Sequence, residues 1–155
     1  MIHLRTVRKE EKELLWNIHQ KYLYEMTHYY DDVMDETGNY HYGYFEDYFT
    51  DPNRSAVLIF LEETLIGFAM IHPYSYFDAH PDHVMAEFTI FPMYRKQKLG
   101  TAAAKQILET CPGSWEIKYH EQNTGAKALW NQVSESYHPE RHQYSEAETV
   151  LVFSV

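Results

Sequence analysis

The stretch AEFTIFPMYRKQKLGTAAA, residues 86–104, determines the fold class that the sequence predicts. It begins as an apolar strand that ends at Pro92, and it continues through basic residues into a glycine- and alanine-rich helix. The first turn of a helix has unpaired N–H groups and a partial positive charge, which suit a phosphate. Arg95, Lys96 and Lys98 add charge there, in a chain of formal net charge −10. The pattern predicts a phosphate-binding turn between strand and helix; charge alone would equally fit a solvated surface turn.

Length and composition limit the class of protein. The 155 residues suffice for a core, and no linker or repeat marks a boundary, so we predict a single domain over residues 1–155. The acid excess argues against nucleic acid or an anionic membrane as a partner. No apolar run approaches the ~20 residues of a membrane span, and the N-terminal residues lack an apolar signal core. Cys111 is the only cysteine. We therefore expect a cytoplasmic protein.

Hydrophobic periodicity predicts the remaining elements. Helices are expected over residues 9–29, 44–49, 99–109 and 123–133. Six strands are expected, over residues 2–7, 56–61, 65–72, 84–91, 114–119 and 148–155. This order predicts one mixed α/β sheet with helices packed on it, although pattern alone does not define the order of the strands.

The basic turn matches neither common nucleotide-binding loop. The chain contains no G-x-x-x-x-G-K-[ST] and no G-x-G-x-x-G, which disfavours a nucleotide hydrolase or a Rossmann dehydrogenase. Instead YRKQKLGTA resembles the acyl-CoA loop of the GNAT superfamily of N-acetyltransferases, Arg/Gln-x-x-Gly-x-Gly/Ala. Arg95 matches the first position and Gly100 the last, whereas Lys98 stands where the first glycine is usual.

A second motif lies downstream. The segment NTGAKALWNQV resembles the family's N-x-x-A-x-x-L-Y helix through Asn123, Ala126 and Leu129, with Trp130 at the usual tyrosine position. The element order of the whole chain fits the superfamily, and the region between the two motifs resembles an uncharacterised bacterial branch of it.

This resemblance implies the GNAT acyl-CoA N-acyltransferase fold, a single mixed and mostly antiparallel sheet that is splayed between strands 4 and 5 and flanked by helices. It also implies acetyl-CoA as co-substrate, no metal, and direct transfer of acetyl to a primary amine in a ternary complex. Pantetheine would insert at the splay. The residues expected to contact acetyl-CoA are Ile90, Arg95, Lys96, Gln97, Lys98, Leu99, Gly100, Thr101, Asn123, Ala126 and Trp130.

The chemistry requires an acceptor amine without its proton, because an alkylammonium has a pKa near ~10.4 and is not nucleophilic. Glu87, within the fourth expected strand, is the candidate base; a surface or salt-bridged glutamate is the alternative interpretation. In the family a tyrosine at the Trp130 position often protonates the leaving thiolate, and an indole is no useful acid. Tyr137 or a water is the candidate acid, unless none is needed.

The acceptor side is expected around the first helices and the hairpin ends, where tyrosines, histidines and acids are frequent. Such a mix suits a small cationic or aromatic amine. The expected substrate contacts are Tyr29, Tyr30, His72 and Tyr74. Ten histidines raise a metal hypothesis, but we find no spacing that places paired ligands on one face of an element, so we expect no metal site. A protein or peptide acetyltransferase, a catalytically silent acyl-CoA-binding regulatory module and a homodimer remain open alternatives.

Overall fold

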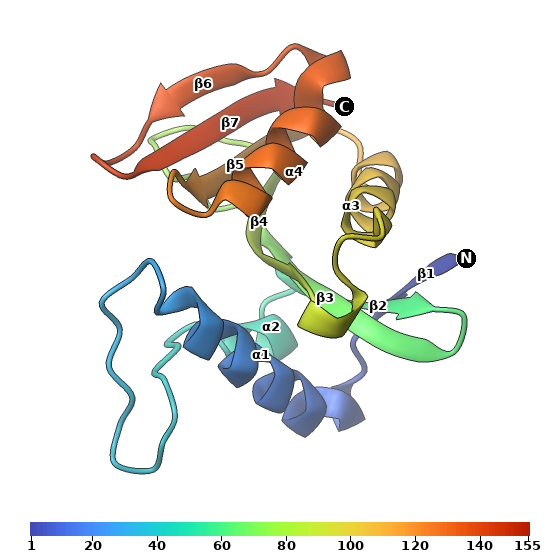
Figure 1. Cartoon of the computed structure of the whole chain (residues 1–155), viewed down its shortest axis with the longest axis vertical. Helices are drawn as coiled ribbons and strands as arrows, with labels where there is room; N and C mark the ends of the chain where they lie inside the picture. The colour runs from blue at the N-terminus through green and yellow to red at the C-terminus, as the bar shows by residue number, and fades with distance from the viewer.

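Seven strands form one sheet in the order β1-β2-β3-β4-β5-β7-β6 (Figure 1). The computed structural model describes residues 1–155. The strands are β1 (Ile2–Thr6), β2 (Ser55–Leu61), β3 (Thr64–His72), β4 (His83–Ile90), β5 (Ser114–His120), β6 (Glu140–Gln143) and β7 (Glu148–Ser154). The α-helices are α1 (Lys12–Met26), α2 (Asp47–Thr50), α3 (Leu99–Thr110) and α4 (Thr124–Ser134), and the 3-10 turns are Lys9–Glu11, Pro92–Tyr94 and Glu135–Tyr137.

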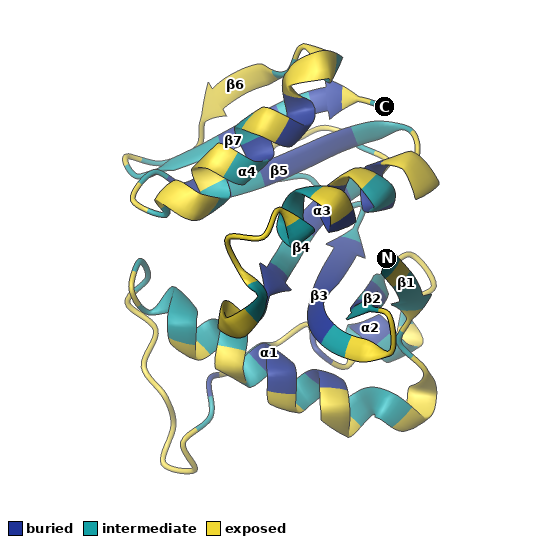
Figure 2. Ribbon diagram, turned by 45° about the vertical axis from the view of Figure 1, so that its right-hand side comes forward, coloured by how far each residue is buried: buried dark blue, intermediate teal, exposed yellow.

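The expected mixed, mostly antiparallel sheet is confirmed, because β4 and β5 form its one parallel pair. The expectation of six strands was wrong. Strand β6 pairs only with β7 at an edge of the sheet, and all four of its residues are exposed (Figure 2). A strand with no buried face has no apolar alternation, so periodicity could not reveal it. The first helix is also shorter than expected and ends at Met26.

The helices cover both faces of the sheet. Because successive strand side chains point to opposite faces, Leu58 and Phe68 pack with α1 and α2 in one cluster, while Ile59 and Ala69 pack with α3 and α4 in the other. The sheet is therefore the middle layer of three. No helix is long and apolar enough to cross a bilayer.

Strands β4 and β5 separate soon after they meet. Their pairing covers three positions and ends at Met85 and Ile117. In the pairing of β4 with β3, Met70 lies opposite Glu87 and Ile71 opposite Met85, so the register shifts at Ala86. Such a bulge bends a strand and redirects its side chains. Beyond it β4 follows β3 to Ile90, while β5 follows β7, and the sheet is splayed as the resemblance implied.

Helix α1 buries a histidine without hydrogen-bond partners. The His19 side chain has no solvent exposure, and neither ring nitrogen is hydrogen-bonded. Its ring packs edge-on against Tyr42 with 4.3 Å between centroids. Burial lowers the pKa of His19 to about 4, so the folded protein keeps this imidazole neutral at pH 5, whereas the unfolded chain begins to bind a proton below its ordinary pKa of ~6.5.

We therefore expect His19→Leu to stabilise the protein, and more so in acid. Since the unfolded state binds more protons between pH 6.5 and 4, the stability of the wild type falls as the pH is lowered through that range. At pH 7 the variant gains ~1–3 kcal/mol by removing two unpaired buried nitrogens, and at pH 5 a further ~2 kcal/mol. Urea unfolding at both pH values measures this, with the exposed His3→Leu as control. A His19→Leu protein less stable than wild type at pH 5 would contradict the expectation.

Candidate active site

A cavity of about 870 Å³ opens where β4 and β5 separate. Its walls come from the splayed part of β4, the end of β5, the first turn of α3, the cavity-facing side of α4, the second half of α1 and the loop after it. It collects most of the residues expected from the sequence, namely Tyr29, Tyr30, His72, Glu87, Ile90, Arg95, Lys96, Lys98, Gly100, Thr101, Asn123, Ala126 and Trp130.

Four expected residues lie outside the cavity lining: Gln97, Leu99, Tyr74 and Tyr137. The Tyr137 ring stacks on Phe153, 5.7 Å between centroids, within the core beneath α4. The Tyr74 hydroxyl donates to Asp51 at 2.6 Å and the residue is exposed. The structure therefore does not bring these two tyrosines together with Glu87.

The loop that precedes α3 presents a row of free backbone donors. The N–H groups of residues 96–101 donate no hydrogen bond within the protein. Lys96 and Lys98 both have a φ of 62°, in the left-handed region that favours glycine. Lys98 thus occupies the usual glycine position in a conformation that costs a non-glycine residue ~1–2 kcal/mol. Successive N–H groups turned toward one side by such a backbone form an anion-binding concavity.

The Arg95 guanidinium is bound by the protein itself. Its Nε donates to the backbone carbonyl of Ile90 at 2.7 Å, and its two terminal nitrogens donate to the carboxylate of Glu25 at 2.5 and 2.7 Å. A further bond of 3.1 Å reaches the Thr89 hydroxyl. The hydrogen bonds from Arg95 also lower the pKa of Glu25. Arg95 therefore ties the end of β4 to α1, and Lys96 and Lys98 are the cations of this loop left without a protein partner.

The second motif forms the opposite wall. The Asn123 side chain caps α4 by accepting from the backbone N–H of Ala126 at 3.2 Å. Trp130 is 4% exposed and packs edge-on against Phe88 of β4, with 5.0 Å between ring centroids. Helix α4 thus places an apolar ring beside the splayed part of β4, where the pantetheine arm was expected.

Glu87 lines the cavity just beyond the bulge of β4. Burial raises the pKa of its carboxyl to about 8, against the opposing effects of the Tyr22 hydroxyl, the Lys118 charge and the Tyr42 hydroxyl. A carboxyl group that titrates near neutral pH in a cavity is suited to proton transfer.

Tyrosines dominate the remaining wall; the sequence analysis named Tyr29 and Tyr30 among them, and the others were not named individually. Those that line the cavity are Tyr22, Tyr29, Tyr30, Tyr40, Tyr42, Tyr44, Tyr76 and Tyr119. Lys118 of β5 was also missed; its signal was a charged residue between two buried apolar side chains, Ile117 and Tyr119. Burial lowers the pKa of His72 to about 4, so this imidazole is neutral at pH 7.

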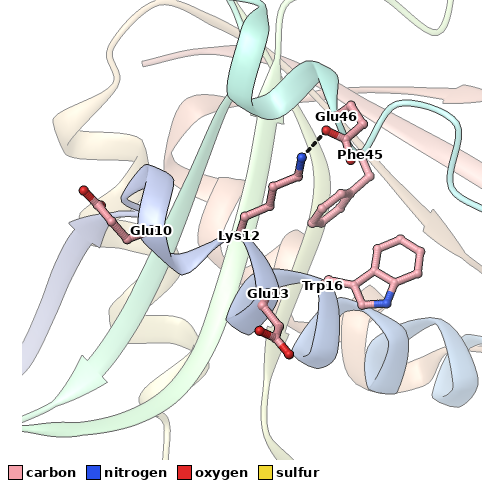
Figure 3. Close-up of a pocket in the computed structure, with 6 residues that line it drawn as sticks. All are labelled: Glu10, Lys12, Glu13, Trp16, Phe45 and Glu46. Atoms are coloured by element: carbon pink, nitrogen blue, oxygen red, sulfur yellow. Dashed lines mark hydrogen bonds and ion pairs between the residues drawn. The ribbon is translucent and has the colours of Figure 1, made fainter.

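A second hollow, of about 570 Å³, lies on the outer side of α1 (Figure 3). Trp16 and Phe45 form its apolar part, and the ammonium of Lys12 pairs with Glu46 at its rim. Neither the loop before α3 nor Glu87 lines it. The basic residues before α3 and the carboxyl of Glu87 therefore line the first cavity and not this hollow.

The splayed sheet has free backbone N–H groups before α3 on one side and a titratable carboxyl on the other, which is the arrangement that the GNAT resemblance implied. The sequence matches the family model described as "Acetyltransferase (GNAT) family" over residues 13–134. The chain therefore belongs to the GNAT acetyltransferase family, and it is an acetyl-CoA-dependent N-acetyltransferase.

Solved structures confirm the fold. An acetyltransferase from Thermus thermophilus is similar with a TM-score of 0.70 at 15% identity, over 100% of this chain and 97% of that one. The PaiA N-acetyltransferase from Thermoplasma acidophilum, in complex with coenzyme A, gives 0.62 at 13% identity over 100% and 99%. NAA60 from Arabidopsis thaliana, in complex with acetyl-CoA, gives 0.63 at 12% identity over 100% and 99%. Comparison with curated proteins finds no match.

Proposed function

We propose that this protein, as a single domain over residues 1–155, acetylates the primary amine of a small molecule while acetyl-CoA and the amine are bound together. The observation that carries the proposal is the composition of one cavity. At one end are free N–H groups of residues 96–101 with two unpaired lysines, and at the other are Glu87 and the tyrosines. One end suits phosphates and the other an amine.

Acetyl-CoA would supply the acetyl group as a thioester, and the residues present fit its parts. The N–H groups before α3, with Lys96 and Lys98, would hold the pyrophosphate. From Ala86 onward β4 has no partner on the side of β5, so its backbone is available to the pantetheine arm. A backbone N–H near Ile90 would donate to the thioester oxygen, where negative charge develops during transfer.

Glu87 would accept a proton from the acceptor ammonium, directly or through a water, so that the amine nitrogen can attack the thioester carbonyl. The bond from carbonyl carbon to sulfur then breaks. Because a thiol titrates near ~8.5, the thiolate can leave without an acid. The position of Tyr137 against Phe153, away from the cavity lining, favours this simpler route.

The cavity walls favour a small cationic or aromatic amine. Tyrosine faces attract cations, and Asp32 lines the cavity without a hydrogen bond or an ion pair of its own. We expect a mass-spectrometric screen with acetyl-CoA to give acetylated products from diamines and arylalkylamines, and little from neutral amino alcohols of similar size.

The same screen separates the alternatives. Transfer only to peptide N-termini or lysines would indicate a protein acetyltransferase. Any ligand of the native state, acetyl-CoA included, should stabilise the protein against heat. If acetyl-CoA does so but no amine is acetylated, the protein would be the silent regulatory module. The support for this last alternative is that Lys98 and Trp130 stand where the family motifs usually have glycine and tyrosine.

A further inference from the structure

Lys118 lies where the two halves of the sheet separate. The last paired residues are Met85 of β4 and Ile117 of β5, and Lys118 is the next residue of β5. Beyond this point Glu87 and Lys118 both line the cavity, each on its own strand. The other cationic side chains of the lining, Arg95, Lys96 and Lys98, belong to the phosphate loop. Lys118 is therefore the one cation of the acceptor end.

The Lys118 ammonium is held from three sides. Its Nζ lies 4.8 Å from the ring centroid of Tyr76 and 5.1 Å from that of Tyr144. The Glu148 carboxylate is 3.0 Å away, and it completes the enclosure from β7. Three separate segments thus converge on one charge: the loop after β3, the β6–β7 hairpin and β7 itself.

Two of these partners, Glu148 and Tyr76, are held by hydrogen bonds of their own. Glu148 accepts hydrogen bonds from the hydroxyls of Tyr30 and Ser145, both at 2.9 Å. The buried carboxylate of Glu116 accepts from the Tyr76 backbone N–H at 2.7 Å and from the Ser75 hydroxyl at 2.5 Å. Movement of the Lys118 side chain away from this position would therefore cost its ion pair with Glu148 and both aromatic contacts.

We propose that Lys118 is a positioning residue whose fixed charge favours the carboxylate form of Glu87, the form that removes a proton from the acceptor amine. This inference rests on the proposed function of Glu87. Lys118 forms no bond to the substrates; it acts through the base.

The groups that face Glu87 from each neighbouring element support this role. They are Tyr22 from α1, Tyr30 and Asp32 after α1, Tyr42 and Tyr48 around α2, Tyr76 after β3, and Lys118 from β5. The pKa values of these five tyrosines are raised, chiefly by burial, so they are uncharged at pH 7. Burial and Asp32 oppose ionisation of Glu87, whereas hydrogen bonds from Tyr22 and Tyr42 and the positive charge of Lys118 favour it.

The test is a titration of the Glu87 carboxyl by ¹³C NMR in the free protein, with the signal assigned through Glu87→Gln. We expect a wild-type midpoint near pH 8, as burial sets it. Lys118→Met removes the charge and keeps the stem, and it should raise the midpoint by about one pH unit. Lys118→Arg should keep the wild-type midpoint. Glu148→Gln should lower the Glu87 midpoint, because the Glu148 carboxylate then no longer balances the positive charge of Lys118.

The matched control is Lys127→Met. Lys127 forms a comparable ion pair with Glu121 at 2.6 Å but does not line the cavity, so its loss should leave the Glu87 midpoint unchanged. An unchanged midpoint in Lys118→Met overturns the proposal; if that variant does not fold, an unchanged midpoint in Glu148→Gln does so. The titration needs neither acetyl-CoA nor an amine. A shifted midpoint together with a fully active Glu87→Gln enzyme would therefore overturn the base role of Glu87 and leave the electrostatic effect standing.

Discussion

Glu87→Gln is expected to lower the rate of acetyl transfer at pH 7 by ~10²–10⁴, the usual contribution of a positioned base. Glutamine keeps the shape and hydrogen-bonding capacity of the side chain but cannot accept the proton. Affinity for acetyl-CoA should stay at the wild-type value, because the proposed phosphate site, the loop before α3, lies at the other end of the cavity. Steady-state kinetics with the best amine of the screen and calorimetry with acetyl-CoA measure the two quantities.

The pH profile sharpens this test. A carboxyl with a pKa of about 8 is a base only when deprotonated, so the wild-type kcat/KM should rise with pH through that value. The kcat/KM of Glu87→Gln should lack the rise due to Glu87 and should depend on pH only through the ionisation of the amine. The difference in rate between the variant and the wild type should therefore become smaller at high pH. Glu63→Gln, at an exposed turn, is the control. Near-wild-type turnover of Glu87→Gln at pH 7 would assign proton removal to water or to another residue of the acceptor side.

Gly100→Val is expected to weaken acetyl-CoA binding by about 100-fold or more, which corresponds to ~2.7 kcal/mol. Gly100 lies in the first turn of α3 and lines the cavity. A Cβ built there meets the Ile90 side chain at 3.5 Å and the Leu129 side chain at 3.9 Å, which is ordinary contact. The two methyl groups of valine extend beyond that Cβ, between the end of β4 and α4, where the cofactor arm would pass.

Gly100→Ala is the matched control. Its single methyl group fits the space that the structure leaves, so the affinity measured by calorimetry should fall only slightly. Circular dichroism should show that both variants are folded. If the folded Gly100→Val protein bound acetyl-CoA with wild-type affinity, the proposed position of the cofactor at this turn would be contradicted.

Local pattern predicted those parts of the fold that have a buried face. Strand β4 and helix α3 were expected within a residue or two of their observed bounds. The apolar residues of each recur with the period of a strand or of a helix, respectively. Strand β6, exposed along its whole length, has no such period. The splay between β4 and β5 depends on pairing between distant segments, and only the family resemblance implied it.

The candidate site was predictable where chemistry follows from a short motif, and not where it depends on distant partners. The sequence shows that Arg95 is charged, but not that Glu25, 70 positions earlier, binds it. The enclosure of Lys118 by Tyr76 and Tyr144 is equally non-local. Tyr137 was chosen for its chemical type, and the core packing that directs its ring to Phe153 leaves no trace in the local sequence.

The separation of β4 from β5 is also a division along the chain. Strands β1 to β4 and helix α3 all precede Gly113, and β5 to β7 with α4 all follow it. The phosphate loop and Glu87 lie in the first part, whereas Lys118 and Trp130 lie in the second. Recombination between relatives at this junction would exchange Lys118 together with Tyr144 and Glu148, and leave Glu87 and the loop before α3 unchanged. The reactivity of such an enzyme can thus diverge while its co-substrate stays the same.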